Sequence, residues 1–189
     1  MKESSQAYTA RISSYVAGVD HLSVLRSTPK TIAALLRRRT PGFLKRRSAD
    51  GKWSIAEILS HLAESEIVIA FRFHLVIGSN GTTIQAFDQD SWQTHAGYLI
   101  KRPLKALELF TVLRESNVAF LKSLTQDEWK AFGLHTERGE ESIRRMVELY
   151  AGHDVNHLRQ IRTMVGQDGV VRRKGGVPGK GRKARKRRP

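Results

Sequence analysis

Apolar residues recur with the spacing of an α-helix in four separate stretches of this chain, and this pattern restricts the fold more than any other feature. The stretches cover residues 28–39, 54–77, 103–124 and 140–165, and capping residues, glycines or prolines bound them. We find no convincing stretch with the alternation of apolar and polar residues that marks a half-buried strand. The sequence therefore predicts an all-α four-helix bundle.

Local signals set the expected helix boundaries. Thr28-Pro29 pairs an N-capping threonine with a proline at the first helical position, and Thr40-Pro41-Gly42 ends that helix. Ser54 and Glu57 fit a capping box at the start of the next helix. A turn is expected over 133–139, before the last long helix, and a short amphipathic helix is expected near residues 7–16.

Two histidines interrupt the apolar stripe of the last helix. The stripe runs through Met146, Tyr150 and Ile161, and His153 and His157 occupy positions where the helical period requires core residues. Because they are four residues apart, both imidazoles project from one face and can reach one metal ion. The alternative is a pair of hydrogen-bonded core histidines without a metal.

A third ligand is available on the second long helix, where His61 lies on the inward side. His61 is about 10 Å along the axis from its helix start, and His157 is about 12 Å from its helix end. The two levels coincide if these helices run antiparallel. A crossover through the long segment 80–102 would produce that arrangement, in an up-down-down-up topology.

Three motifs together carry a family resemblance. They are GKWSIAEILSHLAESE at residues 51–66, AFDQDSW at 86–92 and GHDVNHLRQI at 152–161. In combination they resemble the DinB-like superfamily, over about residues 20–166. The resemblance implies a four-helix up-down-down-up bundle in which three histidines, matching His61, His153 and His157, hold a divalent metal. Members of this superfamily include thiol-dependent S-transferases and a mycothiol-dependent isomerase.

Three imidazoles leave coordination positions open on a divalent ion, as in catalytic rather than structural sites. The donor set suits Zn, Ni, Mn or Fe, and the spacing does not choose among them. An open position can bind water or a low-molecular-weight thiol. Glu64 and Gln160 are candidates to hydrogen-bond the ligating histidines, although a solvated helix face is slightly favoured for Glu64. No residue is assigned as catalytic.

Basic charge is concentrated at the end of the chain. The formal net charge is +15, yet residues 172–189 hold ten basic residues and no acid, which leaves a body of net charge +5. We divide the chain into an N-terminal extension (1–19), the bundle (20–168) and a disordered basic tail (169–189). The tail is either a solubilising polycation or a phosphate-binding arm for nucleic acid or another polyanion.

Composition excludes several classes of protein. The chain has no cysteine, so disulfides, thiolate metal ligands and cysteine nucleophiles are absent. We see neither a secretory signal nor a membrane span, and expect a soluble, cytoplasmic protein without membrane partners. Two functions remain: a metal-dependent enzyme acting on a small-molecule substrate, such as a thiol S-transferase, or a non-enzymatic metal-stabilised binding module. A homodimer is compatible with either.

Overall fold

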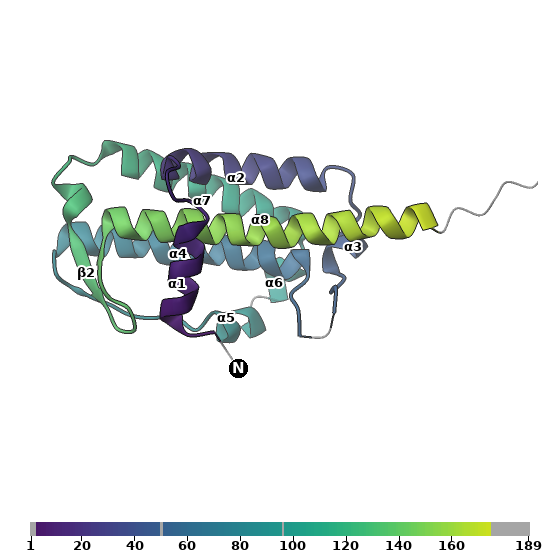
Figure 1. Cartoon of the computed structure of the whole chain (residues 1–189), viewed down its shortest axis with the longest axis horizontal. Helices are drawn as coiled ribbons and strands as arrows, with labels where there is room; N and C mark the ends of the chain where they lie inside the picture. Colours follow the sequence, from purple (N-terminus) through teal and green to yellow (C-terminus); the bar gives the residue numbers. More distant parts are fainter. Residues whose placement is uncertain (1–2, 50, 96, 175–189) are drawn as a thin grey trace, which may run out of the picture.

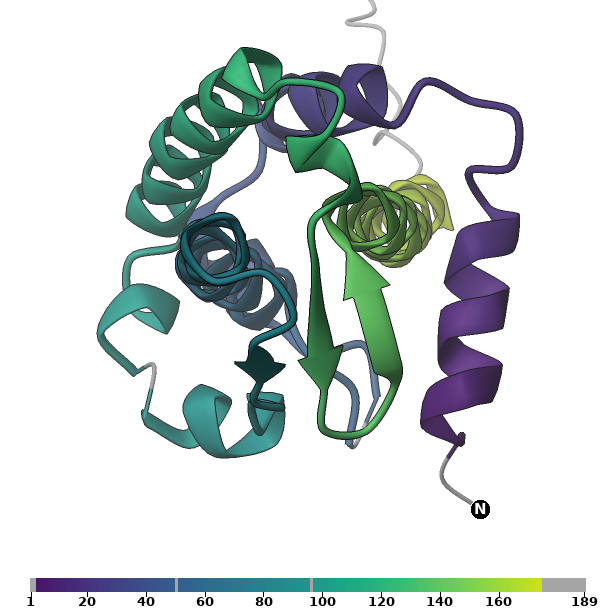
Figure 2. The same cartoon turned by 90° about the vertical axis from the view of Figure 1, so that its left-hand side faces the viewer.

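The computed structural model describes residues 3–49, 51–95 and 97–174, and within them the long helices pack side by side (Figure 1). These are α2 (His21–Leu36), α4 (Ile55–Gly78), α7 (Pro103–Ser123) and α8 (Ile143–Lys174). Helix α4 packs on α7, and α2 packs on both α7 and α8. The view along the bundle in Figure 2 shows these helices arranged around a common interior. The prediction of a helical bundle is confirmed, although the structure is mostly helical rather than all-α.

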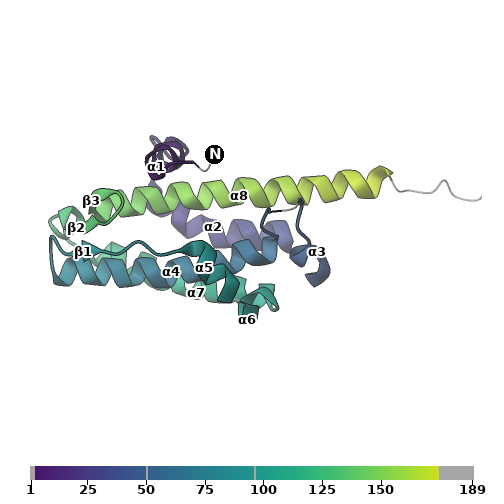
Figure 3. The same cartoon turned by 90° about the horizontal axis from the view of Figure 1, so that it is seen from below.

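Shorter elements cover the bundle. Helix α1 (Ser5–Ser14) lies across α8, as Figure 1 shows. Helix α3 (Pro41–Lys45) and the 3₁₀ helix η1 (Glu128–Lys130) connect longer elements. Between α4 and α7, the long segment contains β1 (Thr83–Ile84), α5 (Gln89–His95) and α6 (Gly97–Ile100), which run along one side of α4 (Figure 3). No helix in the described part of the chain is long and apolar enough to cross a membrane.

Two groups of buried apolar side chains form the core. One gathers around Ile58 and Phe110, and the other around Phe73 and Val147. These residues belong to the apolar stripes that predict the helices, and Phe73 and Phe110 are among the largest side chains that are almost fully buried. Burial of these stripes supplies the main driving force for helix association.

The start of α2 differs from the prediction. The helix begins at His21 with Asp20 as its N-cap, and Pro29 lies inside it. The Thr28 hydroxyl donates to the Val24 carbonyl one turn back instead of capping a new helix. An internal proline leaves the carbonyl four residues earlier without its helical donor, and here Arg114 Nη1 donates to Leu25 O at 2.8 Å. A tertiary hydrogen bond therefore replaces the missing helical one.

The segment predicted as a plain turn forms a hairpin, and this prediction was wrong. Strands β2 (Phe132–His135) and β3 (Gly139–Ser142) pair antiparallel, and β1 adds a parallel pairing to β2. The inward residues of β2 are Gly133 and His135. Because neither has an apolar side chain, the strand lacks the alternation of apolar and polar residues by which a sequence predicts a strand. Gly133 is required because a Cβ there would lie 2.5 Å from Ile84 Cδ1.

The last helix is longer than predicted. Helix α8 continues through Lys174, so the boundary expected at residue 168 falls inside it, and residues 169–174 are helical rather than disordered. Residues 175–189, which hold most of the predicted basic tail, lie outside the described residues.

Candidate metal centre

His61 is placed by the firmly capped start of α4. The Ser54 hydroxyl accepts from the Glu57 N–H at 3.2 Å, and Glu57 Oε2 accepts from the Ser54 N–H at 2.7 Å, so the predicted capping box is confirmed. Arg47 Nε also donates to Glu57 at 3.1 Å. Two turns later, His61 faces inward between the buried Ile58 and Leu62.

The three histidines singled out by the sequence converge. His61 Nε2 lies 2.8 Å from His153 Nε2, which lies 3.1 Å from His157 Nε2. One ring nitrogen from each residue lies within 4.8 Å of the other two, a spacing at which all three could hold one ion. His61 and His157 are buried and His153 is half-buried.

The surroundings keep these imidazoles neutral. Burial lowers the pKa of His61, and the neighbouring His157 lowers it further. Burial also lowers the pKa of His153, with smaller contributions from the other two histidines and Arg114. Burial brings the pKa of His157 to about 4, although Gln160 and Asp154 oppose that shift. Neutral imidazoles are the form that binds a metal ion.

Gln160 determines which nitrogen of His157 is available. Gln160 Oε1 lies 3.0 Å from His157 Nδ1 and can accept only if Nδ1 carries the proton. In the neutral ring, Nε2 then has a free lone pair that faces the other two histidines. The sequence analysis names Gln160 as a candidate to hydrogen-bond a ligating histidine. In metalloproteins such a hydrogen bond fixes the tautomer and the ring orientation of the ligand.

Aromatic rings border the cluster. The Trp53 indole lies 5.0 Å from the His61 ring and is stacked parallel to the His157 ring, with centroids 6.3 Å apart. The Tyr150 ring lies 5.9 Å from His153, and its hydroxyl donates to the Ser65 carbonyl at 2.8 Å. The places of Trp53 and Tyr150 beside the histidines depend on how α4 and α8 meet.

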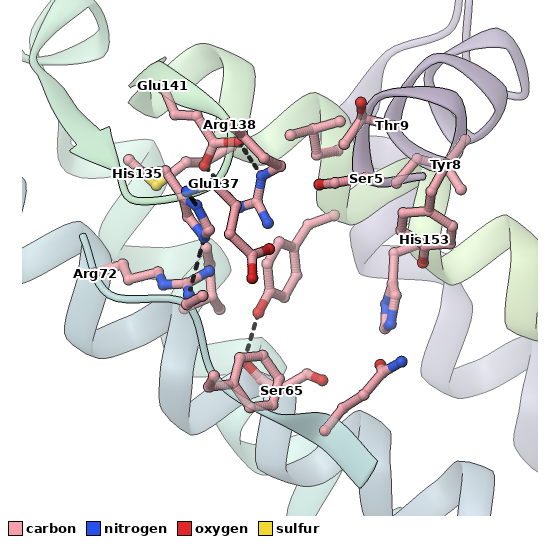
Figure 4. Close-up of a pocket in the computed structure, with 18 of the residues that line it drawn as sticks. Ser5, Tyr8, Thr9, Ser65, Arg72, His135, Glu137, Arg138, Glu141 and His153 are labelled. Carbon is pink, nitrogen blue, oxygen red and sulfur yellow. Dashed lines mark hydrogen bonds and ion pairs between the residues drawn. The ribbon is translucent and has the colours of Figure 1, made fainter. Parts of the chain in front are cut away.

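A cavity of about 790 Å³ opens beside the cluster, and His61 and His153 line it. In Figure 4, Tyr8 and its neighbours from α1 lie on the same side as His153, whereas Arg72 and His135 lie at the opposite side. The cavity is large enough for a drug-sized ligand. Because two of the three neutral imidazoles line this cavity, an ion held by the cluster could be reached by a bound small molecule.

Comparison with known proteins identifies the family. A family model described as the DinB superfamily matches residues 25–161, most of the chain. The chain belongs to the DinB superfamily. The match confirms the resemblance carried by the three sequence motifs. The matched residues include all three histidines of the cluster.

Curated relatives of this DinB-superfamily chain carry provisional names as metal-dependent hydrolases. OB0413 from Oceanobacillus iheyensis is 27% identical over 121 residues, 63% of this chain and 68% of that protein. YfiT from Bacillus subtilis is 24% identical over 141 residues, 74% of this chain and 79% of that protein. The solved structure of YfiT, described as a probable metal-dependent hydrolase with an unusual four-helix bundle topology, matches with a TM-score of 0.73 at 20% identity. It covers 89% of this chain and 91% of that one, and the likeness establishes the fold.

Glu64 is not joined to the histidines of this DinB-superfamily site. It is buried, which raises the pKa of its carboxyl group. Within the described residues it has no hydrogen bond to the three histidines, and it does not line the cavity. The prediction that it hydrogen-bonds a ligand therefore has no support from these contacts.

A buried ionic cluster behind the histidines escaped sequence reasoning. Arg114 Nη1 donates to Asp154 Oδ2 at 2.6 Å, and Arg114 Nη2 donates to Glu66 Oε1 at 2.7 Å. Asn117 Nδ2 also donates to Glu66 at 2.9 Å. Asp154 follows His153 directly, so this cluster anchors the turn of α8 that carries the histidines. The sequence signal that could have revealed this cluster is a polar residue at a helix position that faces inward.

Proposed function

We propose that this chain is a metal-dependent enzyme that holds one divalent ion between His61, His153 and His157 and acts on a small-molecule substrate. The observation that carries the proposal is the convergence of three imidazole nitrogens beside a cavity that His61 and His153 line. No further histidine or carboxylate of the described residues joins this group. Structural zinc sites usually have four protein ligands, so a three-ligand set facing a cavity favours catalysis.

The residues present fit such an ion. All three imidazoles are neutral, and Gln160 leaves the His157 lone pair directed at the cluster. Imidazole donors suit Zn, Ni, Mn and Fe alike. When bound, the ion supplies Lewis-acid activation of a nucleophile or a substrate carbonyl. Trp53 shields the histidines on one side, while the cavity side of His153 remains accessible to substrate.

Two reactions suit this site. Hydrolysis is the activity in the names of the relatives, and it needs only water as nucleophile. Transfer to or from a low-molecular-weight thiol is the activity implied by the sequence resemblance. The volume of about 790 Å³ has room for a thiol beside its electrophilic partner, so the cavity supports both.

We also propose the up-down-down-up topology, with residues 79–102 as the crossover. His61 meets His153 while Ser65 meets Tyr150, which supports antiparallel α4 and α8. Glu66 meets Arg114 while Phe73 stacks on Phe120, which supports parallel α4 and α7. This order brings the three imidazoles to one level, as the metal site requires.

The alternative is a metal-stabilised binding module that contacts polyanions through residues 172–189. Its support is the ten basic residues of this segment. Truncation before Arg172 separates the two functions: polyanion binding, with its steep salt dependence, is lost, and metal content is retained. A homodimer and a cytoplasmic location stay predictions.

Elemental analysis of untagged protein purified without chelator tests the metal site. We expect about one divalent ion per chain, and its loss in His61→Ala, His153→Ala and His157→Ala. His74→Ala is the matched control, because His74 is exposed and outside the cluster. A wild-type protein without metal, or metal retained in all three variants, contradicts the proposal.

Turnover then separates the two reactions. The metal-loaded protein is assayed with ester, amide and alkyl-halide substrates, with and without added thiols. Turnover of esters or amides without thiol indicates a hydrolase, whereas turnover only with thiol indicates a transferase. In both cases His153→Ala should abolish turnover, because His153 lies between the other two histidines and lines the cavity.

A further inference from the structure

Arg72 is a buried cation on the cavity wall without a carboxylate partner. Its side chain is 6% exposed. Arg72 Nη2 donates to the Gln85 carbonyl at 2.7 Å, and its guanidinium lies 5.8 Å from the Phe87 ring centroid. Within the described residues no carboxylate forms an ion pair with it. Burial lowers the pKa of Arg72, which reflects the cost of this unpaired charge.

His135 adds a second donor beside Arg72. The Glu137 backbone N–H donates to His135 Nδ1 at 3.2 Å, so Nδ1 must be unprotonated. Burial lowers the pKa of His135 to about 4, and the ring is therefore neutral near pH 7 with its proton on Nε2. His135 Nε2 lies 3.5 Å from Arg72 Nη2. Two N–H donors thus stand next to each other with no acceptor between them.

Two carboxylates that line the same cavity, those of Glu137 and Glu141, form no ion pair with Arg72. Glu141 is engaged by Arg138, whose Nε and Nη2 donate to its two oxygens at 2.6 and 2.9 Å. Glu137 is exposed to solvent and forms no ion pair with Arg72. Arg138 also adds positive potential around His135. Arg72 and His135 therefore offer two donors to the cavity, and neither Glu137 nor Glu141, which also line it, accepts a hydrogen bond from them through its carboxylate.

We propose that Arg72 and His135 form an oxyanion site that binds a carboxylate or phosphate group of the ligand. The inference rests on the proposed function in one respect, namely that the same ligand reaches the three histidines. Arg72 lies eleven residues after His61 on α4, which is about 16 Å along the helix axis. The substrate is therefore an elongated molecule with its anionic group far from the reacting centre. A guanidinium suits both anions because it can donate two parallel hydrogen bonds.

Calorimetric titration with benzoate, phenyl phosphate and neutral benzamide tests this site in the full-length protein. Wild type should bind at least one of the two anions about tenfold more tightly than benzamide, as expected for charge-assisted hydrogen bonds. The ratio of benzoate to phenyl phosphate affinity identifies the preferred anion. Arg72→Gln should lose about tenfold in affinity for that anion, and Arg72→Lys should recover part of it.

Arg38→Gln is the matched control, since Arg38 is exposed and does not line the cavity; its anion affinity should stay within about twofold. Equal binding of benzamide and both anions by wild type overturns the proposal, whatever the variants do. Unchanged anion affinity in Arg72→Gln also overturns it, because an anion bound at the three histidines would survive that change. Metal content, measured on the same samples, reports separately on the proposed function.

Discussion

At the scale of single residues, His135 shows how burial controls protonation in this cavity. It is 3% exposed, it lies between Arg72 and Arg138, and its pKa falls from 6.5 to about 4, chiefly because of burial. In the unfolded chain the same histidine takes up a proton below about pH 6.5. Between pH 6.5 and pH 4 the unfolded state binds more protons than the folded state, so the stability of the fold decreases as the pH falls.

We therefore predict that His135→Gln reduces the loss of stability on acidification. The free energy of unfolding, from urea titrations at pH 7 and pH 5, should fall less in His135→Gln than in wild type. Some decrease remains, because the pKa values of the three clustered histidines are also lowered. His74→Gln, at an exposed histidine, should decline as steeply as wild type. Identical declines in wild type and His135→Gln would contradict this account.

At the scale of elements, the contact between α1 and α8 completes the cavity. Arg11 of α1 donates to Asn156 of α8 at 3.0 Å, and Arg145 of α8 donates to Ser13 at 2.9 Å. The two helices approach so closely at Gly152 that a Cβ there would lie 2.2 Å from the Ile12 carbonyl oxygen. Because α1 lies outside the residues matched by the family model, this glycine allows an additional helix to form part of the cavity wall.

We predict that Gly152→Ala displaces α1 from α8. Hydrogen exchange of the α1 amides should accelerate, and the melting temperature should fall, because backbone of Ile12 rather than a flexible side chain must move. Gly166→Ala is the matched control on the same helix, where nothing lies within 4 Å of the added Cβ. That control should gain about 0.5–1 kcal/mol from helix propensity. Unchanged exchange in α1 of Gly152→Ala would refute the close approach.

At the scale of the whole molecule, Arg114 links the long helices through one buried cluster. From α7 it contacts the Leu25 carbonyl of α2, Glu66 of α4 and Asp154 of α8. Burial opposes its charge, but Asp154 and Glu66 together raise the pKa of the guanidinium. One residue thus forms ion pairs with two buried carboxylates and supplies the hydrogen bond that Pro29 removes from α2.

We predict that Arg114→Ala destabilises the protein by about 3–5 kcal/mol, since it leaves two buried carboxylates unpaired. Urea unfolding monitored by circular dichroism measures the change. Lys105→Ala is the control on the same helix, and its exposed ion pair with Glu108 should be worth less than about 1 kcal/mol. Equal effects of the two substitutions would show that the cluster does not tie the helices together.

Local periodicity and capping determined the helices, and with them the candidate site. Helical spacing located α4, α7 and most of α8, and the Ser54–Glu57 box located the start of α4. The histidine spacing, together with an assumed antiparallel meeting of two helices, selected the three residues that converge. These features are readable because each depends on residues within a few turns of one another.

Tertiary contacts decided what local rules could not. Pro29 is tolerated inside α2 because Arg114, 89 residues from Leu25, bonds the freed carbonyl. The inward residues of the β2–β3 hairpin are not apolar. Its stability therefore depends on the pairing of β2 with β3 and of β1 with β2. The oxyanion site joins a helix residue to a strand residue 63 positions away. Such contacts bring together distant residues whose positions only the packed fold fixes, and no short-range pattern encodes them.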